Sequence, residues 1–183
     1  MQRIMIIRHA EKHSTGGRER GVNIDGVHAH HELTVRGWQR AGALVRFFAP
    51  VAGAPPEPAI STPRAILASA ATASSPSLRA QHTVRPLAEM LGLRVDNAHP
   101  DGAEPAVAVA ALAAEGPVLI AWHHSHIPTL ARAIAGADLG CPAAWPDDRF
   151  DVVWTLDRSD ADGAWAFSQI AQRLMAHDRA DAI

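Results

Sequence analysis

Two short apolar runs in the sequence each end in residues that bind or attack phosphate. The run 4–7 is followed directly by Arg8 and His9, and the run 117–122 is followed by the histidine-rich segment 123–126. Apolar runs of this length predict buried strands. In open α/β sheets, ligands bind at the carboxyl ends of the strands. The two runs therefore predict a single crevice where imidazole and guanidinium groups meet an anion.

A third segment, 75–83, supplies another arginine near the predicted start of a helix. A Ser-Pro pair precedes Arg79, so the helix dipole and the guanidinium can face the same anion. Phosphoryl transfer needs a nucleophile, fixed positive charges around the phosphoryl oxygens and a proton donor for the leaving group. These three segments contain all of those residue types.

Four motifs follow one another between residues 3 and 135. They are Arg8-His9-Ala10-Glu11, Leu33-Thr34-x-x-Gly37-x-x-Arg40-Ala41, Ser75-Pro76-x-x-Arg79-Ala80-x-x-Thr83 and Trp122-His123-His124-x-x-Ile127. In this order they resemble the motifs of the histidine phosphatase superfamily, the phosphoglycerate mutase-like group, in its smaller phosphatase branch. The Arg-His pair alone would be a weak signal, whereas the ordered set is specific.

The resemblance implies a covalent mechanism that needs no metal and no other cofactor. His9 would attack phosphorus and form a phosphohistidine, which water then hydrolyses. Arg8, Arg79 and His124 would hold the phosphoryl oxygens and stabilise the developing charge. The segment between Arg79 and His124 is too short for the long insertion of the family's mutases, which favours a phosphatase. The substrate would be a small phosphorylated molecule or a phosphoprotein.

The second histidine is ambiguous in register. Both His123 and His124 follow the strand, and a shift of one residue turns a strand side chain to the other face. We predict His124, because this choice leaves Ile127 to pack in the core. His126 is expected to be a neighbouring pocket residue.

The proton donor is expected after the second-arginine helix. Glu104 is the predicted general acid and Asp101 is the alternative; an ordinary first-turn helix residue is an equal interpretation of Glu104. Glu11 and Lys12 are predicted to line the pocket, with a surface ion pair as the other interpretation. The long, histidine-rich loop 13–31 leaves the substrate open.

The elements that position these residues alternate between strand and helix. Apolar spacing predicts helices over 34–49, 74–91, 104–114 and 128–136, and strands over 4–7, 65–69, 93–95, 117–122, 150–156 and 164–170. In the first helix Thr34 is the predicted N-cap and Val35 is expected to point inward; a Pro-rich connector over 50–58 should follow. Pro86 should kink or restart the second helix, and the tail 171–183 should be a frayed helix or irregular. This order predicts one domain over 1–183, a three-layer α/β/α sandwich with a mainly parallel sheet and an antiparallel C-terminal edge hairpin.

Composition narrows the class of protein. The formal charge of -2 over 183 residues provides no basic field for nucleic acid or an anionic membrane. No apolar stretch approaches the length of a membrane span, and no signal-peptide core is visible. The single cysteine, Cys141, fits a reducing compartment. We therefore expect a cytoplasmic enzyme; the sequence does not predict its oligomeric state.

Two other functions are compatible with the residues. Segments 28–32 and 123–126 have the spacing of metal ligands, which would suit a metal-dependent hydrolase. Alternatively, the chain could be a regulatory module that binds phosphate without turnover. A chelator separates the first alternative from the phosphohistidine scheme, because only the metal enzyme would lose its activity.

Overall fold

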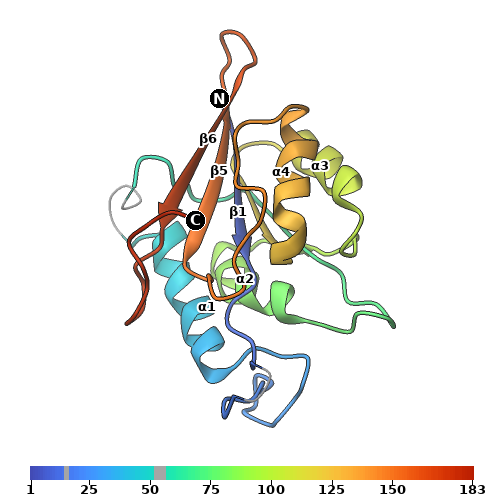
Figure 1. The fold of residues 1–183 in the computed structure, drawn as a ribbon, viewed down its shortest axis with the longest axis vertical. Helices are drawn as coiled ribbons and strands as arrows, with labels where there is room; N and C mark the ends of the chain where they lie inside the picture. The colour runs from blue at the N-terminus through green and yellow to red at the C-terminus, as the bar shows by residue number, and fades with distance from the viewer. Residues whose placement is uncertain (15–16, 52–56) are drawn as a thin grey trace.

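The computed structural model describes residues 1–14, 17–51 and 57–183, which form one six-stranded sheet with helices on both faces (Figure 1). The strands are β1 (Gln2–Arg8), β2 (Ala65–Ala68), β3 (Val95–Asp96), β4 (Val118–Trp122), β5 (Val152–Arg158) and β6 (Trp165–Ala171). The helices are α1 (Val35–Phe48), α2 (Arg79–Leu91), α3 (Glu104–Ala113) and α4 (Ile127–Ala135), with a 3₁₀ turn, η1, over His124–His126.

The sheet has the order β3-β2-β4-β1-β5-β6. The pairs β1–β4, β4–β2 and β2–β3 are parallel, while β5 is antiparallel to β1 and to β6. The predicted mainly parallel sheet with an antiparallel edge hairpin is therefore confirmed. Arg8 is in register with Trp122, so β1 and β4 end at the same level.

Two apolar layers cover the sheet, one on each face. Ile4 and Ile6 pack with residues of α3 and α4, whereas Met5 and Ile7 pack with residues of α1 and α2. Successive strand residues point to opposite faces, so a strand covered on both sides must be apolar throughout. The predicted three-layer sandwich is confirmed, and Figure 1 shows α3 and α4 together on one side of the sheet.

Helix α1 begins as predicted, with Thr34 as its N-cap. The Thr34 side chain accepts a hydrogen bond from the Gly37 N–H at 3.2 Å. The predicted inward position of Val35 is wrong, because its side chain is 60% exposed. The buried stripe runs through Gly37 and on to Phe48, and at 3.6 residues per turn Val35 lies on the opposite side.

Helix α2 differs from the prediction in two ways. It begins at Arg79 rather than near 74, because residues 72–75 form a turn in which the Ser75 N–H donates to Thr72. It also continues through Pro86 without a break. The helix ends at Gly92, whose positive φ of 67° is the left-handed conformation that favours glycine at this position.

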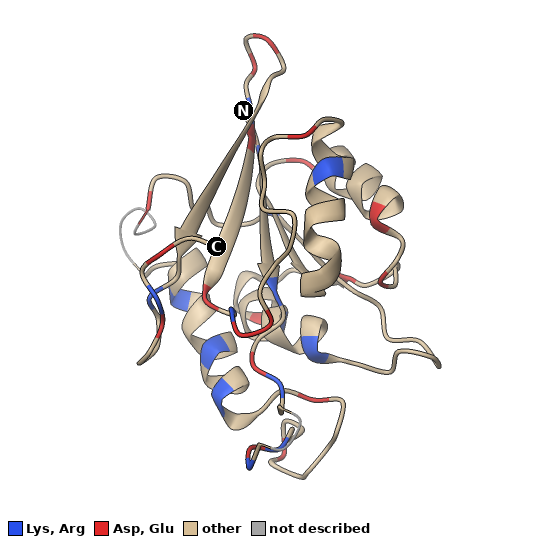
Figure 2. Cartoon of the chain, viewed as in Figure 1, with Lys and Arg blue, Asp and Glu red and all other residues tan. Residues whose placement is uncertain are grey.

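The tail after β6 is irregular, and the predicted connector 50–58 lies partly outside the described residues. No helix within the described ranges is long and apolar enough to cross a membrane. Acidic positions lie in the loop before β5, close to basic positions at the carboxyl end of β1 (Figure 2).

Candidate active site

Backbone contacts bring three distant segments together at the carboxyl ends of β1 and β4. The His9 N–H donates to the Trp122 carbonyl at 3.1 Å. The next N–H, of Ala10, donates to Thr83 Oγ1 at 2.7 Å, and that hydroxyl donates to the Arg79 carbonyl at 2.7 Å. The start of α2 is thus attached to the residue that follows His9.

The His9 imidazole is held as a neutral base. Its ring is buried, and Nδ1 lies 2.7 Å from the Ala10 carbonyl oxygen. Because a carbonyl can only accept, Nδ1 carries the proton and Nε2 carries the free electron pair. Burial, together with the neighbouring Arg8 cation, lowers the pKa of His9 well below its usual 6.5. This is the state that a nitrogen nucleophile requires.

We expect the His9 imidazole to stay neutral, with its proton on Nδ1, as the pH falls through 6.5. Below pH 6.5 the His9 imidazole is protonated in the unfolded chain but still neutral in the folded chain. Folding then competes with protonation, so the protein loses stability as the pH falls from 6.5 toward the lower pKa of His9 in the folded state. The ¹⁵N chemical shifts of the imidazole report both the tautomer and the titration. A midpoint at or above 6.5 would contradict this assignment.

Arg8 is 1% exposed, and within the described residues only one of its three guanidinium nitrogens has a hydrogen-bond partner. Nη1 donates to the Pro146, Asp147 and Arg149 carbonyls at 3.2, 2.6 and 3.2 Å. The guanidinium carbon lies 3.9 Å above the Phe150 ring. Nε and Nη2 are buried without a hydrogen-bond partner among the described residues. Burial lowers the pKa of Arg8 to about 10, so it stays cationic at neutral pH.

Two more cations lie in the same environment. Arg79 Nε donates to the Glu32 carbonyl at 3.1 Å and Nη2 donates to the His30 carbonyl at 2.8 Å, so the loop before α1 holds this side chain. The pKa of Lys12 is lowered by burial and by the nearby charges of Arg8 and Arg79. The predicted arginines and Lys12 are therefore gathered in one positive region.

The structure places His123 beside His9 and the predicted His124 beside Asp147. The His9 and His123 ring centroids are 6.0 Å apart, whereas His124 Nε2 lies 2.6 Å from Asp147 Oδ1. Burial lowers the pKa of His123 to about 4, so its ring is neutral at neutral pH. The strand alternation that made the choice between His123 and His124 ambiguous does not extend to them, because β4 ends at Trp122 and η1 begins at His124.

Glu104, the predicted acid, is held as an ionised acceptor. Its Oε1 accepts from Trp122 Nε1 at 3.0 Å and from the Gly102 N–H at 2.9 Å. Burial alone would raise the pKa of Glu104, but these hydrogen bonds outweigh it and lower the pKa. By contrast, burial raises the pKa of Asp101. His126 lies 3.1 Å from Glu104 and 5.8 Å, between ring centroids, from His123.

Glu11 forms a buried ion-pair cluster instead of facing a pocket. Its carboxylate lies 2.9 Å from Arg40 and 3.3 Å from Arg36, and Arg40 also contacts Asp178 at 2.6 Å. The contacts thus support an ion pair for Glu11, although the pair is buried and not at the surface as expected. The cluster connects the chain after His9 to α1 and the tail.

The residues that sequence reasoning missed are Asp147, Phe150 and Thr83. Asp147 lies in a turn-rich crossing, and Phe150, the expected first residue of a strand, precedes β5, which begins at Val152; neither position has a local sign of function. Thr83 stood in a motif, but its hydrogen bonds to Ala10 and Arg79 depend on the packing of α2 beside β1.

The histidine clusters do not assemble a metal site. Among residues 1–14, 17–51 and 57–183, no three His, Cys, Asp or Glu side chains are placed to hold one ion. The His30 ring lies between those of His13 and His31, at centroid distances of 4.3 and 5.2 Å, but these three side chains are not placed to hold one ion. The metal-dependent hydrolase gains no support from this arrangement.

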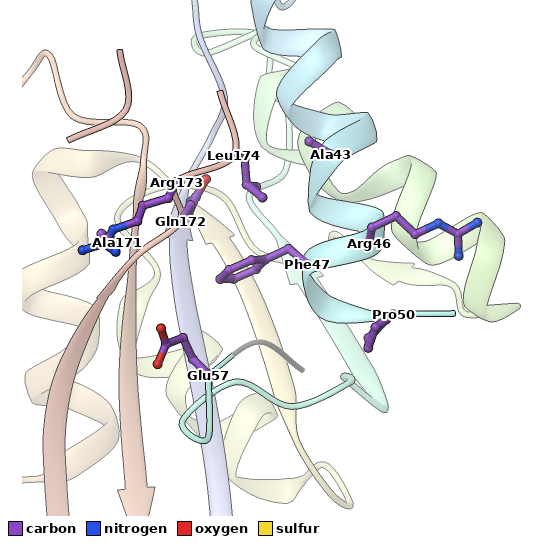
Figure 3. A pocket seen from close by; sticks show the side chains of 9 residues that line it. All are labelled: Ala43, Arg46, Phe47, Pro50, Glu57, Ala171, Gln172, Arg173 and Leu174. Carbon is purple, nitrogen blue, oxygen red and sulfur yellow. The ribbon is translucent and has the colours of Figure 1, made fainter. Parts of the chain in front are cut away.

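A separate hollow lies between the end of α1 and the chain after β6 (Figure 3). Phe47 and Leu174 provide its apolar surface, and Arg46, Arg173 and Glu57 surround it. The lining residues in the described part of the chain include none of the predicted site residues.

Comparison with known proteins gives matches in structure but not in sequence, since no family model and no curated protein matches the chain. A mycobacterial glucosyl-3-phosphoglycerate phosphatase, solved with VO3, is 16% identical with a TM-score of 0.57, over 92% of this chain and 97% of its own. The alpha-ribazole phosphatase from Shigella flexneri is 16% identical with a TM-score of 0.56, over 97% and 100%. The protein histidine phosphatase SixA, solved with tungstate, is 17% identical with a TM-score of 0.56, over 93% and 97%.

These identities are low, so the similarity concerns the fold. The three structures named above are histidine phosphatase superfamily members. The chain therefore has the fold of the histidine phosphatase superfamily, as its four motifs predicted.

Proposed function

We propose that the chain is a phosphatase that hydrolyses a phosphomonoester, or a phosphorylated protein, through a phosphohistidine on His9. One observation carries the proposal: a buried, neutral histidine lies beside an arginine with two buried donors and no partner for them among the described residues. Buried polar groups are normally hydrogen-bonded, so unused donors indicate the place of a ligand. Two guanidinium N–H groups suit a phosphoryl oxygen pair.

In the first half of the reaction, His9 Nε2 attacks phosphorus while the bond from phosphorus to the leaving oxygen breaks. Arg8 Nε and Nη2, with Arg79 and Lys12, stabilise the negative charge on the phosphoryl oxygens. Neutral His123 can donate one hydrogen bond from Nε2 when its Nδ1 accepts from the Ser125 hydroxyl at 2.8 Å. In the second half, water displaces His9 and releases phosphate.

The similar structures support the class of reaction and not one substrate. Their names specify glucosyl-3-phosphoglycerate, alpha-ribazole and protein histidine phosphatases, which act on very different molecules. We therefore propose a phosphorylated metabolite or protein without choosing between them. A cytoplasmic location and independence from metal ions are part of the same proposal.

The test is to trap the intermediate. The protein is mixed with a ³²P-labelled phosphomonoester, quenched in alkali and digested, and the label is mapped by mass spectrometry. We expect an acid-labile, alkali-stable label on His9, with turnover unchanged by a chelator. A label on another residue, or complete loss of turnover that added metal restores, would overturn the phosphohistidine scheme.

A further inference from the structure

The Asp147 carboxylate is exposed, but its backbone belongs to a turn that hydrogen bonds hold in place. Its side chain is 84% exposed, while its backbone carbonyl accepts from Arg8 Nη1 at 2.6 Å. The turn is closed by the Arg149 N–H, which donates to the Pro146 carbonyl at 3.2 Å. Trp145 Nε1 donates to the Arg149 carbonyl at 2.9 Å. The same arginine that offers two donors to phosphate thus positions this carboxylate beside the site.

The Asp147 carboxylate contacts the His124 imidazole, with 2.6 Å between Asp147 Oδ1 and His124 Nε2. The His124 side chain is mostly buried, and its ring centroid is 4.5 Å from that of His123, the neighbour of His9. Burial and the nearby charges of Arg8 and Lys12 lower the pKa of His124, while the Asp147 carboxylate opposes them, so His124 lies in the same positive region. An imidazole that touches a carboxylate can hold and return a proton.

We propose that His124 and Asp147 together are the acid–base pair of this site, donating a proton to the leaving oxygen and later accepting one from water. This inference rests on the proposed phosphatase function and replaces Glu104 in that role. Glu104 is not suited to this role, because the hydrogen bonds that its Oε1 accepts from the Trp122 indole and the Gly102 N–H keep the carboxylate ionised, without a proton to donate. Asp147, in contrast, faces solvent, where a leaving group can reach it.

The proton balance is simple. The protonated pair has one proton on His124 Nδ1 and one between Nε2 and Asp147 Oδ1. As the bond between phosphorus and the leaving oxygen breaks, its electron pair goes to that oxygen, which takes the bridging proton. A neutral imidazole and a carboxylate remain. In the second step the pair takes a proton from water as the water oxygen bonds to phosphorus and the electron pair of the N–P bond returns to His9.

The sharpest test compares leaving groups. The nitrophenolate of p-nitrophenyl phosphate can leave without being protonated, whereas the alkoxide of glycerol phosphate needs a proton in order to leave. In His124→Gln and in Asp147→Asn we expect kcat/KM for glycerol phosphate to fall by about 100-fold, against less than about fivefold for p-nitrophenyl phosphate. The matched control is Asp148→Asn, the adjacent exposed carboxylate, with both rates near wild type. Equal losses on the two substrates, or no loss on either, would overturn the pair.

A second measurement does not depend on turnover. Because the Asp147 carboxylate favours the imidazolium, Asp147→Asn should lower the pKa of His124 in an imidazole ¹⁵N titration, and Asp148→Asn should leave it nearly unchanged. An unchanged His124 titration in Asp147→Asn would overturn the coupling. If wild type hydrolyses neither ester, the proposed function fails; if it hydrolyses both and the variants show no leaving-group dependence, only this inference fails.

Discussion

His9→Gln is expected to reduce kcat by about 10⁴-fold or more, the largest effect on activity that we predict. Glutamine retains a polar side chain of similar length but has no electron pair able to form a stable bond to phosphorus. The Arg8 donors that have no partner among the described residues stay in place, so inorganic phosphate should still bind within about tenfold of the wild-type affinity. Initial rates and isothermal titration with phosphate measure the two effects separately.

The control for this variant is His99→Gln. The His99 backbone carbonyl accepts from the Ala70 N–H, so replacing its side chain leaves that contact intact. Near wild-type turnover is expected. Undiminished turnover in His9→Gln would end the assignment of His9 as nucleophile, and loss of phosphate binding together with turnover would indicate a disturbed site.

Arg40→Met is expected to give the largest loss of stability, about 3–5 kcal/mol in the free energy of unfolding. Arg40 is almost fully buried and holds the Glu11 and Asp178 carboxylates at 2.9 and 2.6 Å. Burial opposes its charge, but the hydrogen bonds to Asp178 and Glu11 outweigh burial and raise the pKa of Arg40 above its usual value. Methionine fills much of the volume and leaves both carboxylates without this partner. Urea unfolding provides the measurement.

Arg36→Met is the matched control. Arg36 approaches the same carboxylates, at 3.3 and 3.8 Å, but its side chain is 32% exposed. Solvent screens such a pair, so the expected loss is below about 1 kcal/mol. Equal losses in the two variants would show that burial does not set the strength of this cluster.

The pH dependence gives an independent check on Arg40. Burial would raise the pKa of Asp178, but its hydrogen bond with Arg40 outweighs burial and lowers the pKa below the usual 3.8. The stabilisation is therefore present above 3.8 and is lost as the pH falls through the folded value. Without Arg40 the folded state protonates this carboxylate more easily. The difference between Arg40→Met and wild type should then shrink toward acid pH.

Much of the fold could be predicted from local sequence. Apolar runs such as 118–122 and the cap at Thr34 act over a few residues, and their spacing differs between strand and helix. The start of α2 could not be predicted in this way, because the Thr72–Ser75 turn competes with helix formation before Arg79. The prediction that Val35 points inward was also wrong, because the packing partners of a helix decide which of its sides is buried.

Some features of the candidate site could likewise be predicted from the sequence, and others could not. The sequence by itself determined that Arg8 and His9 follow one strand and that two histidines follow another, since that order lies in the covalent chain. Only the tertiary structure decided that His123 lies against His9, that Glu11 pairs with Arg40, and that Asp147 meets His124. Those contacts join residues far apart in sequence or depend on the turn after β4. No local spacing determines them, because they form only when the sheet and its loops pack together.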